Sequence, residues 1–181
     1  MSSPSSASGH HRAHAPAASD VRVAIVTASD SRTADTNEGG QTLRRLLEAA
    51  GFTVVADAIL AEEPALLRDE VARLARDSDA VLVTGGTGIS PRDRTPDAVA
   101  PLFERRLPGF GELFRTLSFQ AIGPAAMLSR ADAGVVGSAL VFLLPGSPAA
   151  VELALEKLIV PELAHAVGQL RRRHAHGATH A

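Results

Sequence analysis

The residues best suited to chemistry lie in one segment, TGGTGISPRDRTPDAV, which covers residues 84–99. Its glycines at positions 85, 86 and 88 allow the backbone to approach a ligand closely and to adopt left-handed torsions, so that their amide groups can converge on an anion. Thr87 adds a hydroxyl group to the same concave turn. The segment lacks the Lys-Ser/Thr pair of a Walker A motif and the spacing of a dinucleotide-binding GxGxxG motif. It therefore predicts a phosphate or carboxylate cradle of another kind.

Asp93 stands in the same segment, two residues before Thr95. A carboxylate beside an anion cradle is repelled unless a cation lies between them, as in a Mg²⁺ site that bridges a protein and nucleotide phosphates. The pattern thus indicates metal-assisted phosphate chemistry. The alternative interpretation is a tight strand-to-helix turn in which Asp93 only braces the backbone through local hydrogen bonds. The residues alone leave both open.

Apolar strand-like runs and segments of helical periodicity alternate around this segment. Strands are predicted at residues 21–28, 52–60 and 80–83, and a strand pair or one bent strand at residues 133–144. Helices are predicted over residues 41–50 and 111–121, from Pro64, from Thr95 and from Ser147, the last with a kink or restart at Pro161. The alternation predicts an α/β fold of three layers, with a mainly parallel sheet covered by helices on both faces. Ligands of such sheets bind beyond the carboxyl ends of the strands, where the glycine-rich segment lies.

Two residues are predicted to cap helices. Thr95 precedes Pro96, which suits the first helical position, and Asp97 follows near the positive end of that helix. Ser147 stands in the same relation to Pro148.

Composition excludes several classes of function. Lys plus Arg number 18 and Asp plus Glu number 20, a balance that argues against a nucleic-acid or membrane-surface partner. The six aromatic residues are all Phe, so there is no Tyr or Trp platform for stacked bases. The absence of Cys rules out thiol catalysis, Cys-type zinc sites and disulfides, but it fits cytoplasmic and exported proteins equally. Residues 1–20 and 174–181, rich in Ser, Ala and His, are predicted to be disordered tails of a single domain at residues 21–173. The longest apolar run, residues 139–144, is too short to span a bilayer.

The run GGTGISPRDRTPDA resembles the signature of the MoaB/Mog family of molybdenum cofactor biosynthesis proteins, in which GGTG precedes a short spacer, Arg-Asp, one residue, Thr-Pro and an acidic residue. Three further stretches are similar to the family in order: SDSR, PGFGELFRTLSFQAIG followed by LSR, and LPGSPAAVELALEKLIVPEL. The version of the middle helix is more similar to the MoaB branch. The resemblance covers residues 21–173 and implies a MoaB/Mog-like molybdopterin-binding domain in a cytoplasmic protein.

This resemblance implies adenylylation of molybdopterin: its terminal phosphate attacks the α-phosphorus of ATP, giving adenylyl-molybdopterin and pyrophosphate. Mg²⁺ is the implied cofactor and ATP the co-substrate. Because two anions must meet in line, catalysis would consist mostly of positioning and of charge neutralisation by Mg²⁺ and backbone amides. Asp93 takes the place of the motif aspartate, the expected metal ligand or catalytic carboxylate. The alternative function is a molybdopterin-binding or carrier protein of the MoaB type that does not turn its ligand over.

One stretch departs from the family pattern. Members often carry an aspartate after the second strand, in a Pro-Asp-Glu or similar stretch, whereas this chain reads AEEP and places Glu62 or Glu63 there. Glu62 is the candidate second metal ligand and catalytic carboxylate. Its extra methylene puts turnover at risk more than binding, because catalytic groups are held to about half an ångström. Alternatively, the two glutamates are a solvated pair favoured by the dipole of the helix that begins at Pro64.

The remaining candidates are implied substrate contacts. Ser29 and Asp30 follow the first strand, with simple turn chemistry as the alternative. Free amides at the turn before Pro148 would face a phosphate. Ser129 and Arg130 would position an anionic substrate, although a lone arginine is more often a solvated or paired surface residue. The full set of predicted substrate contacts is Ser29, Asp30, Gly85, Gly86, Thr87, Gly88, Thr95, Ser129, Arg130, Pro145, Gly146 and Ser147.

The resemblance also implies a homo-oligomer, either a trimer or a dimer of trimers, and contact with other proteins of molybdenum cofactor biosynthesis. The apolar helix at residues 110–119, with its several Phe residues, is a candidate contact between subunits. It would serve equally as packing within one subunit.

Overall fold

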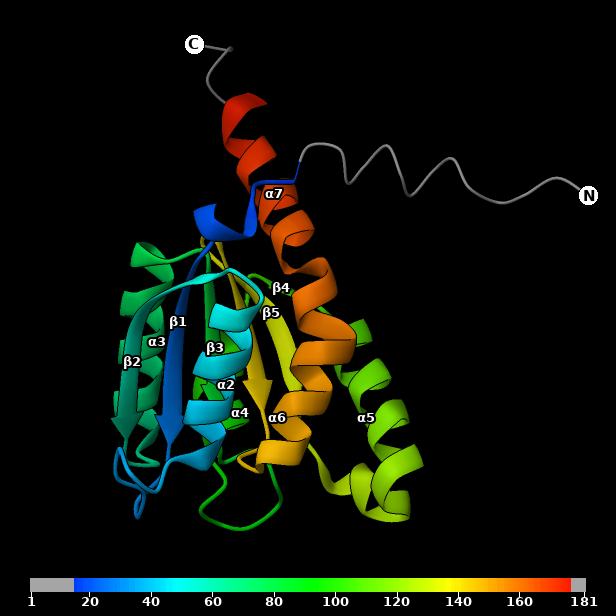
Figure 1. The fold of residues 1–181 in the computed structure, drawn as a ribbon. Helices are drawn as coiled ribbons and strands as arrows, with labels where there is room; N and C mark the ends of the chain where they lie inside the picture. The colour runs from blue at the N-terminus through cyan, green and yellow to red at the C-terminus, as the bar shows by residue number, and fades with distance from the viewer. Residues whose placement is uncertain (1–14, 177–181) are drawn as a thin grey trace, which may run out of the picture.

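The computed structural model describes residues 15–176, whose strands join in one six-stranded sheet of order β2-β1-β3-β6-β5-β4 (Figure 1). The strands are β1 (Arg22–Ala28), β2 (Thr53–Leu60), β3 (Ala80–Thr84), β4 (Arg105–Arg106), β5 (Asp132–Val136) and β6 (Ala139–Leu144). The first four in this order run parallel, whereas β5 is antiparallel to β6 and β4 is antiparallel to β5. The predicted strand pair at residues 133–144 is therefore a hairpin, with its turn at Gly137, where φ is +58°.

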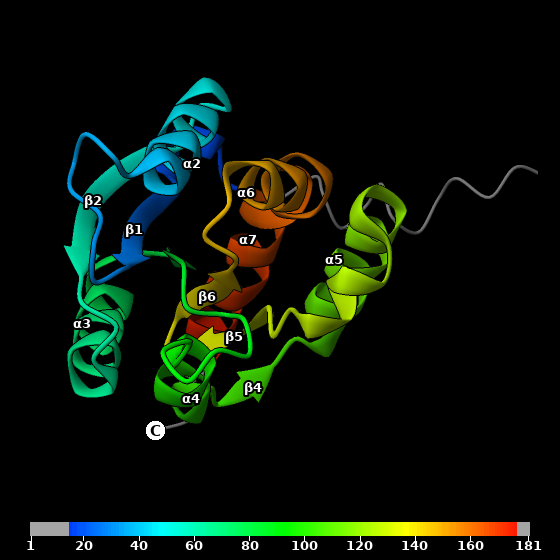
Figure 2. The same ribbon diagram turned by 90° about the horizontal axis from the view of Figure 1, so that it is seen from below.

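Helices cover both faces of the sheet, as Figure 2 shows from below. The α-helices are α2 (Glu38–Ala49), α3 (Pro64–Asp77), α4 (Thr95–Val99), α5 (Pro108–Ile122), α6 (Pro148–Ala154) and α7 (Val160–His176). Shorter helical turns are η1 (Ala18–Asp20), η2 (Ala100–Leu102) and η3 (Gly123–Leu128), and η4 (Leu155–Ile159) is a π-helical segment. The α/β fold with a mainly parallel sheet between helical layers is confirmed.

The central strands read as continuous apolar runs because both of their faces are buried. In β1, Val23 and Ile25 belong to the hydrophobic cluster that includes residues of α2, α5, α6 and α7, while Ala24 and Val26 belong to the cluster that includes residues of α3 and α4. Every residue of β3 and β6 is likewise buried. The edge strand β2 instead alternates between more and less exposed positions.

Two helices begin earlier than their apolar pattern predicts, because glycines hide their first turns. The predicted helix at residues 41–50 starts at Glu38, where the side chain of Asn37 accepts a hydrogen bond from the amide of Gly40 at 3.1 Å. The predicted helix at residues 111–121 starts at Pro108 and includes Gly109 and Gly111.

One predicted cap is wrong and the other holds in position only. Thr95 is itself the first residue of α4, preceded by Arg94, and its hydroxyl has no hydrogen-bond partner among the described residues. The helix expected from Thr95 is also short, because it gives way to η2 after Val99. Ser147 does occupy the capping position of α6, yet its side chain makes no capping bond either.

The predicted kink at Pro161 is replaced by a widened turn just before it. The helical chain passes from α6 through the π-helical segment η4 into α7 without a break in chain direction (Figure 1). Pro161 has no N–H group and its ring crowds the carbonyl of Lys157, four residues earlier. A π-helical turn absorbs that conflict, since it lengthens the local hydrogen-bond ring.

The ends of the described chain extend beyond the predicted domain limits of 21 and 173. Residues of η1 are fixed to the sheet, because Thr53 Oγ1 donates to the carbonyl of Ser19 at 2.8 Å. At the other end, α7 reaches His176, and Arg171 Nη2 donates to the carbonyl of Asp20 at 2.8 Å. The rest of the two predicted tails, residues 1–14 and 177–181, lies outside the described residues. Within residues 15–176 no helix combines the length and apolar character of a membrane span.

The phenylalanines of α5 divide between the interior and the surface. Phe110 stacks on Phe114 with ring centroids 6.1 Å apart and meets Phe142 of β6 edge-on at 5.2 Å. Both are buried, so this part of the helix packs within the subunit. Phe119, by contrast, is 59% exposed.

Candidate active site

Loops from neighbouring parallel strands meet at the carboxyl edge of the sheet. Gly85, directly after β3, donates its amide to the carbonyl of Leu144 at the end of β6, at 3.0 Å. A Cβ atom there would lie 2.3 Å from the carbonyl oxygen of Ala28 at the end of β1, and φ is +101°. Gly85 therefore lies between the ends of β1 and β6. Its amide is bonded to β6 and is not available to the predicted cradle.

The next three residues form the cradle. The carbonyl oxygens of Gly86, Thr87 and Gly88 all accept hydrogen bonds from protein donors, namely Thr95 N at 3.1 Å, Arg130 N at 2.8 Å and Arg130 Nε at 2.7 Å. Their three amide nitrogens make no hydrogen bond to any residue between 15 and 176. Successive free N–H groups in a glycine-rich turn, here with φ of +63° at Gly86, are the components of an anion-binding concavity.

Two carboxylates flank this cradle. A Cβ atom on Gly86 would lie 3.3 Å from Glu62 Oε2, and a Cβ atom on Gly88 would lie 2.8 Å from Asp93 Oδ2. Asp30 supports Glu62 from the neighbouring loop, because its Oδ1 accepts the amide of Glu62 at 2.9 Å. The structure thus distinguishes the two glutamates of AEEP: Glu62 faces the glycine loop, whereas Glu63 occupies the capping position of α3.

The electrostatics around Glu62 favour a cation. Burial raises the pKa of its carboxyl group, the nearby charges of Asp93 and Asp30 raise that pKa further, and Arg92 opposes them. Glu62 Oε2 is buried and has no hydrogen-bond donor among the described residues, and the same holds for Thr95 Oγ1. Both of these oxygens lie against Gly86. Buried oxygens without donors beside repelling carboxylates form a set that a hard cation would satisfy.

The donor set fits Mg²⁺ held jointly with a ligand. No group of three or more His, Cys, Asp or Glu side chains within residues 15–176 is arranged to hold a metal ion by itself. Mg²⁺, however, is usually held by one or two carboxylates together with phosphate oxygens and water. Glu62 and Asp93 match that mode. Asp93 also braces the loop, since its Oδ2 accepts the amide of Ser90 at 2.8 Å, which is the local hydrogen bond expected under the alternative interpretation.

A cavity of about 240 Å³ opens beside the cradle. Its polar rim includes Thr87, Gly88, Ser129 and Ser147, and its apolar wall comes from α5 and η3. Sequence reasoning missed that wall, whose lining residues include Phe114, Ser118, Ile122, Ala125, Ala126 and Leu128. The one available signal was Ser118, a polar residue that is 5% exposed on an otherwise apolar helix face.

Other predicted contacts serve the scaffold. Ser29 Oγ accepts the amides of Ser31 at 3.3 Å and Arg32 at 3.2 Å, which is the turn chemistry foreseen as its alternative. The carbonyl oxygen of Pro145 accepts a hydrogen bond from the hydroxyl of Thr84 at 2.8 Å, and Pro145 also lines the cavity. Gly146 packs its carbonyl against α2, 2.8 Å from where a Cβ atom on Gly39 would lie. Arg130 points its guanidinium at protein carbonyls and at Asp97.

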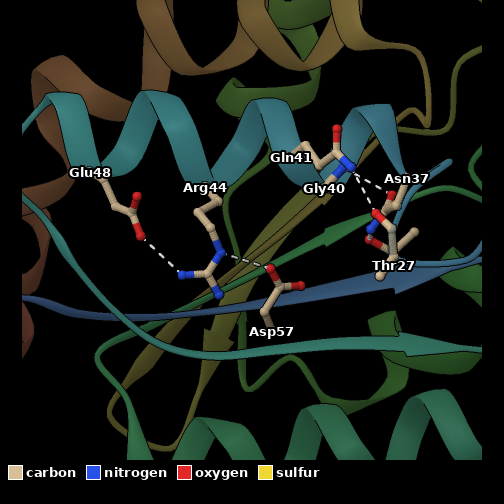
Figure 3. Close-up of polar contacts among 8 residues, drawn as sticks. Thr27, Asn37, Gly40, Gln41, Arg44, Glu48 and Asp57 are labelled. Carbon is tan, nitrogen blue, oxygen red and sulfur yellow. Dashed lines mark hydrogen bonds and ion pairs between the residues drawn. The ribbon is translucent and has the colours of Figure 1, made fainter.

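A buried polar contact fixes α2 at the same edge of the sheet (Figure 3). Asn37 Nδ2 donates to Thr27 Oγ1 of β1 at 2.8 Å, while Asn37 Oδ1 accepts the amide of Gly40. Further along α2, Arg44 Nε donates to Asp57 Oδ2 of β2 at 3.1 Å. These contacts, absent from the predicted set, hold the start of α2 against β1 and its middle against β2.

A model of the molybdenum cofactor biosynthesis family, described as a probable molybdopterin binding domain, matches residues 24–165. The chain is 47% identical over 165 residues to molybdenum cofactor biosynthesis protein B of Bacillus subtilis, covering 90% of this chain and 96% of that protein. This chain belongs to the MoaB family. A crystal structure of a molybdenum cofactor biosynthesis protein B superposes with a TM-score of 0.82 at 44% identity, covering 87% of this chain and 99% of the other. The tungsten cofactor synthesizing protein MoaB of Pyrococcus furiosus gives 0.74 at 32% identity, covering 83% and 97%. The resemblance drawn from the glycine-rich segment is therefore confirmed, and so is the MoaB-like fold.

Proposed function

We propose that this MoaB-family chain is a molybdopterin adenylyltransferase that depends on Mg²⁺ and ATP. The observation that carries the proposal is the juxtaposition of three free amides, at residues 86–88, with two carboxylates, one of which has a buried oxygen without a donor. Phosphate oxygens and a divalent cation are the ligand pair that satisfies both halves of this arrangement at once.

In the proposed reaction, a terminal phosphate oxygen of molybdopterin forms a bond to the α-phosphorus of ATP, and the bond from that phosphorus to the bridging oxygen breaks, releasing pyrophosphate. The phosphate monoester is already largely dianionic at neutral pH, so no general base is needed. Glu62 and Asp93 would hold Mg²⁺, which would neutralise charge on the nucleotide phosphates. The amides of residues 86–88 would orient a phosphate, and the apolar wall of the cavity would exclude water from the pterin.

The test is a turnover assay on purified protein with molybdopterin, ATP and MgCl₂, in which adenylyl-molybdopterin and pyrophosphate are both quantified. Equal amounts of the two products support the proposal. No product from a protein that still binds molybdopterin would reject it.

A non-catalytic molybdopterin-binding role is the second candidate, favoured by Glu62 itself. Its carboxylate stands where relatives of this type are expected to carry the shorter aspartate, and it is repelled by Asp93 and Asp30. Calorimetry separates the two functions. An adenylyltransferase should bind Mg·ATP in a manner that depends on Asp93, whereas a pterin carrier should bind molybdopterin and not the nucleotide.

The proposal extends to a homo-oligomer, a trimer or a dimer of trimers. Large apolar side chains are exposed on α5 and on η3, namely Leu113, Phe119, Ile122, Met127 and Leu128. Exposed apolar side chains gathered on two consecutive helical segments are typical of a protein interface. The proposed contact keeps Leu113 and Phe119 of the predicted residues 110–119 and extends past them to Leu128, while Phe110 and Phe114 are buried within the subunit. Light scattering at micromolar concentration should report a trimer or hexamer, and a monomer would reject this part.

We also infer a cytoplasmic location, because the proposed reaction consumes ATP. Its adenylylated product must be taken up by a further protein of molybdenum cofactor biosynthesis, which makes such a protein the expected partner.

A further inference from the structure

Arg130 is the most heavily bonded side chain at the site. Its Nε donates to the carbonyl of Gly88 at 2.7 Å, its Nη2 donates to the carbonyl of Asp93, and its backbone amide donates to the carbonyl of Thr87 at 2.8 Å. Its Nη1 donates to both carboxylate oxygens of Asp97, at 2.9 and 3.1 Å. All of these acceptors belong to the glycine-rich loop or to the helix that follows it.

Bonds to these carbonyls determine where the neighbouring amides point. In a planar trans peptide unit, the C=O of one residue and the N–H of the next point in opposite directions. By holding the carbonyl of Thr87, Arg130 turns the N–H of Gly88 away from itself, and by holding the carbonyl of Gly88 it does the same to the N–H of Ile89. The cradle thus owes part of its orientation to a residue that does not line it.

The same guanidinium also fixes the other end of the loop. Because Nε and Nη2 hold the carbonyls of Gly88 and Asp93, one rigid planar group sets the spacing between the amide cradle and the residue that carries the flanking carboxylate. The remaining nitrogen of the guanidinium, Nη1, is bonded to the carboxylate of Asp97, which balances the charge of Arg130. Arg130 therefore has little charge or geometry left for an anionic substrate.

We propose that Arg130 is a positioning residue: its backbone amide orients the Gly88 amide of the cradle, and its guanidinium ties the carbonyl of Gly88 to that of Asp93, so that the cradle and the Asp93 carboxylate stay in register. On this proposal Arg130 is not the substrate contact that the sequence suggests. The proposal deepens the adenylyltransferase function above and rests on it for its kinetic part. Its structural part, the alignment of the loop, stands on the hydrogen bonds alone.

The structural part is tested by hydrogen exchange on Arg130→Lys, with Arg115→Lys as the matched control. Lysine keeps the charge but cannot span three acceptors in fixed directions. Arg115 also donates to backbone carbonyls close by, those of Ala131 at 3.0 Å and Ser129 at 3.4 Å, but it reaches no atom of the loop. Arg130→Lys should speed exchange of the hydrogen-bonded loop amides, those of Ser90, Asp93 and Thr95, while the central strands stay protected, and Arg115→Lys should leave the loop unchanged. Unchanged exchange of the loop in Arg130→Lys would overturn the proposal.

The kinetic part is tested by comparing kcat with KM for both substrates. Misplaced reacting groups lower kcat, so Arg130→Lys should reduce it roughly a hundredfold while each KM stays within about threefold. Arg115→Lys should retain kcat within about twofold. A raised KM for molybdopterin with kcat intact would show instead that Arg130 binds the substrate, and would overturn the assignment.

Two further measurements keep the outcomes separable. If the wild-type chain transfers no AMP, the adenylyltransferase proposal fails while the exchange experiment still judges Arg130. If Arg130→Lys does not fold, Asp97→Asn replaces it, because this variant leaves the guanidinium in place but weakens its bidentate anchor. The loop amides should then exchange faster by a smaller factor, and a loop as protected as in the wild type would count against the proposal.

Discussion

Two strand-to-helix loops at the same edge of the sheet differ in whether their polar groups have hydrogen-bond partners. In the loop after β1, Asn37 is 4% exposed and its side chain pairs with both Thr27 and Gly40, while Ser29 closes its own turn. In the loop after β3, the amides of residues 86–88 have no acceptor, and the buried Thr95 Oγ1 has no donor, within the part of the chain that the structure describes. One loop is complete by itself, and the other is incomplete.

The difference separates scaffold from site. A buried polar group without a partner costs about 1–3 kcal/mol, so a chain retains such groups where a ligand completes them. Both loops are polar, so polarity alone does not distinguish them. The hydrogen bonds that each loop makes within the protein do distinguish them.

The largest expected effect is on turnover, from Asp93→Asn. The amide side chain can still brace the loop through Ser90, as the carboxylate now does, but it loses the charge needed to hold a divalent ion. We expect kcat for adenylyl transfer to fall by about 10²–10³-fold with unchanged thermal stability, as measured in a steady-state assay beside a melting curve. A rate within a few-fold of the wild type would remove Asp93 from the site.

The next effect is on stability, from Gly40→Ala in the scaffold loop. A Cβ atom there would lie 2.2 Å from Asn37 Nδ2 and 2.7 Å from Thr27 Oγ1, so the cap of α2 must break (Figure 3). We expect a loss of about 2 kcal/mol in the free energy of unfolding, measured by urea titration at one protein concentration.

Gly109→Ala in α5 is the matched control for this change. Nothing lies within 4 Å of the added methyl group, so the variant should be as stable as the wild type or up to about 1 kcal/mol more stable. If Gly40→Ala has the same free energy of unfolding as Gly109→Ala, the polar contact in Figure 3 does not hold α2.

Two threonine-to-valine substitutions, one in each loop, should change the free energy of unfolding in different directions. Thr27→Val removes the acceptor of Asn37 Nδ2 and should destabilise the chain by about 1–2 kcal/mol. Thr95→Val removes a buried hydroxyl that has no donor and should leave the chain equally or up to about 1 kcal/mol more stable. Calorimetry with Mg·ATP should show weaker binding for Thr95→Val alone. Equal destabilisation by the two variants would contradict the division into scaffold and site.

The fold could be predicted from the sequence because its signals are local. Parallel strands buried on both faces, such as β3 and β6, leave continuous apolar runs, and Pro64 marks the start of α3 where the structure has it. The start of α2 could not be placed, since Gly39 and Gly40 carry no apolar pattern and their role depends on Gly146 and Thr27, far along the chain.

A candidate loop could be named from the sequence, but the roles of its residues could not. Glycine spacing and Asp93 pointed to a loop that has free amides beside two carboxylates among the described residues, yet the choice of Glu62 over Glu63 depends on which side chain reaches Gly86. The resemblance implies that Arg130 contacts the substrate, and its bonds to the carbonyls of Gly88 and Asp93 could not be foreseen, because backbone acceptors have no signature in a sequence. Roles that depend on direction across space, such as these two, require the structure.

The smallest expected effect is a pH dependence centred on Glu62, and its sign follows from the raised pKa. When folding raises the pKa of a carboxyl group above its ordinary value of 4.5, the folded state resists ionisation, so stability is lost as pH rises through the interval between the two values. Glu62→Gln should therefore melt at a higher temperature than the wild type at pH 7, and the difference should vanish as pH approaches about 4.5.

Glu70 on α3 provides the control of opposite sign. The hydrogen bond from Arg73 lowers the pKa of its carboxyl group, so Glu70→Gln should be slightly less stable at pH 7, with the difference again vanishing in acid. Millimolar Mg²⁺ with ATP should raise the melting temperature of the wild type and of Glu70→Gln, and raise that of Glu62→Gln less, because a neutral amide is a poorer magnesium ligand. If Glu62→Gln melts below the wild type at pH 7, the carboxylate is already satisfied within the protein, and the loop after β3 is no less complete than the loop after β1.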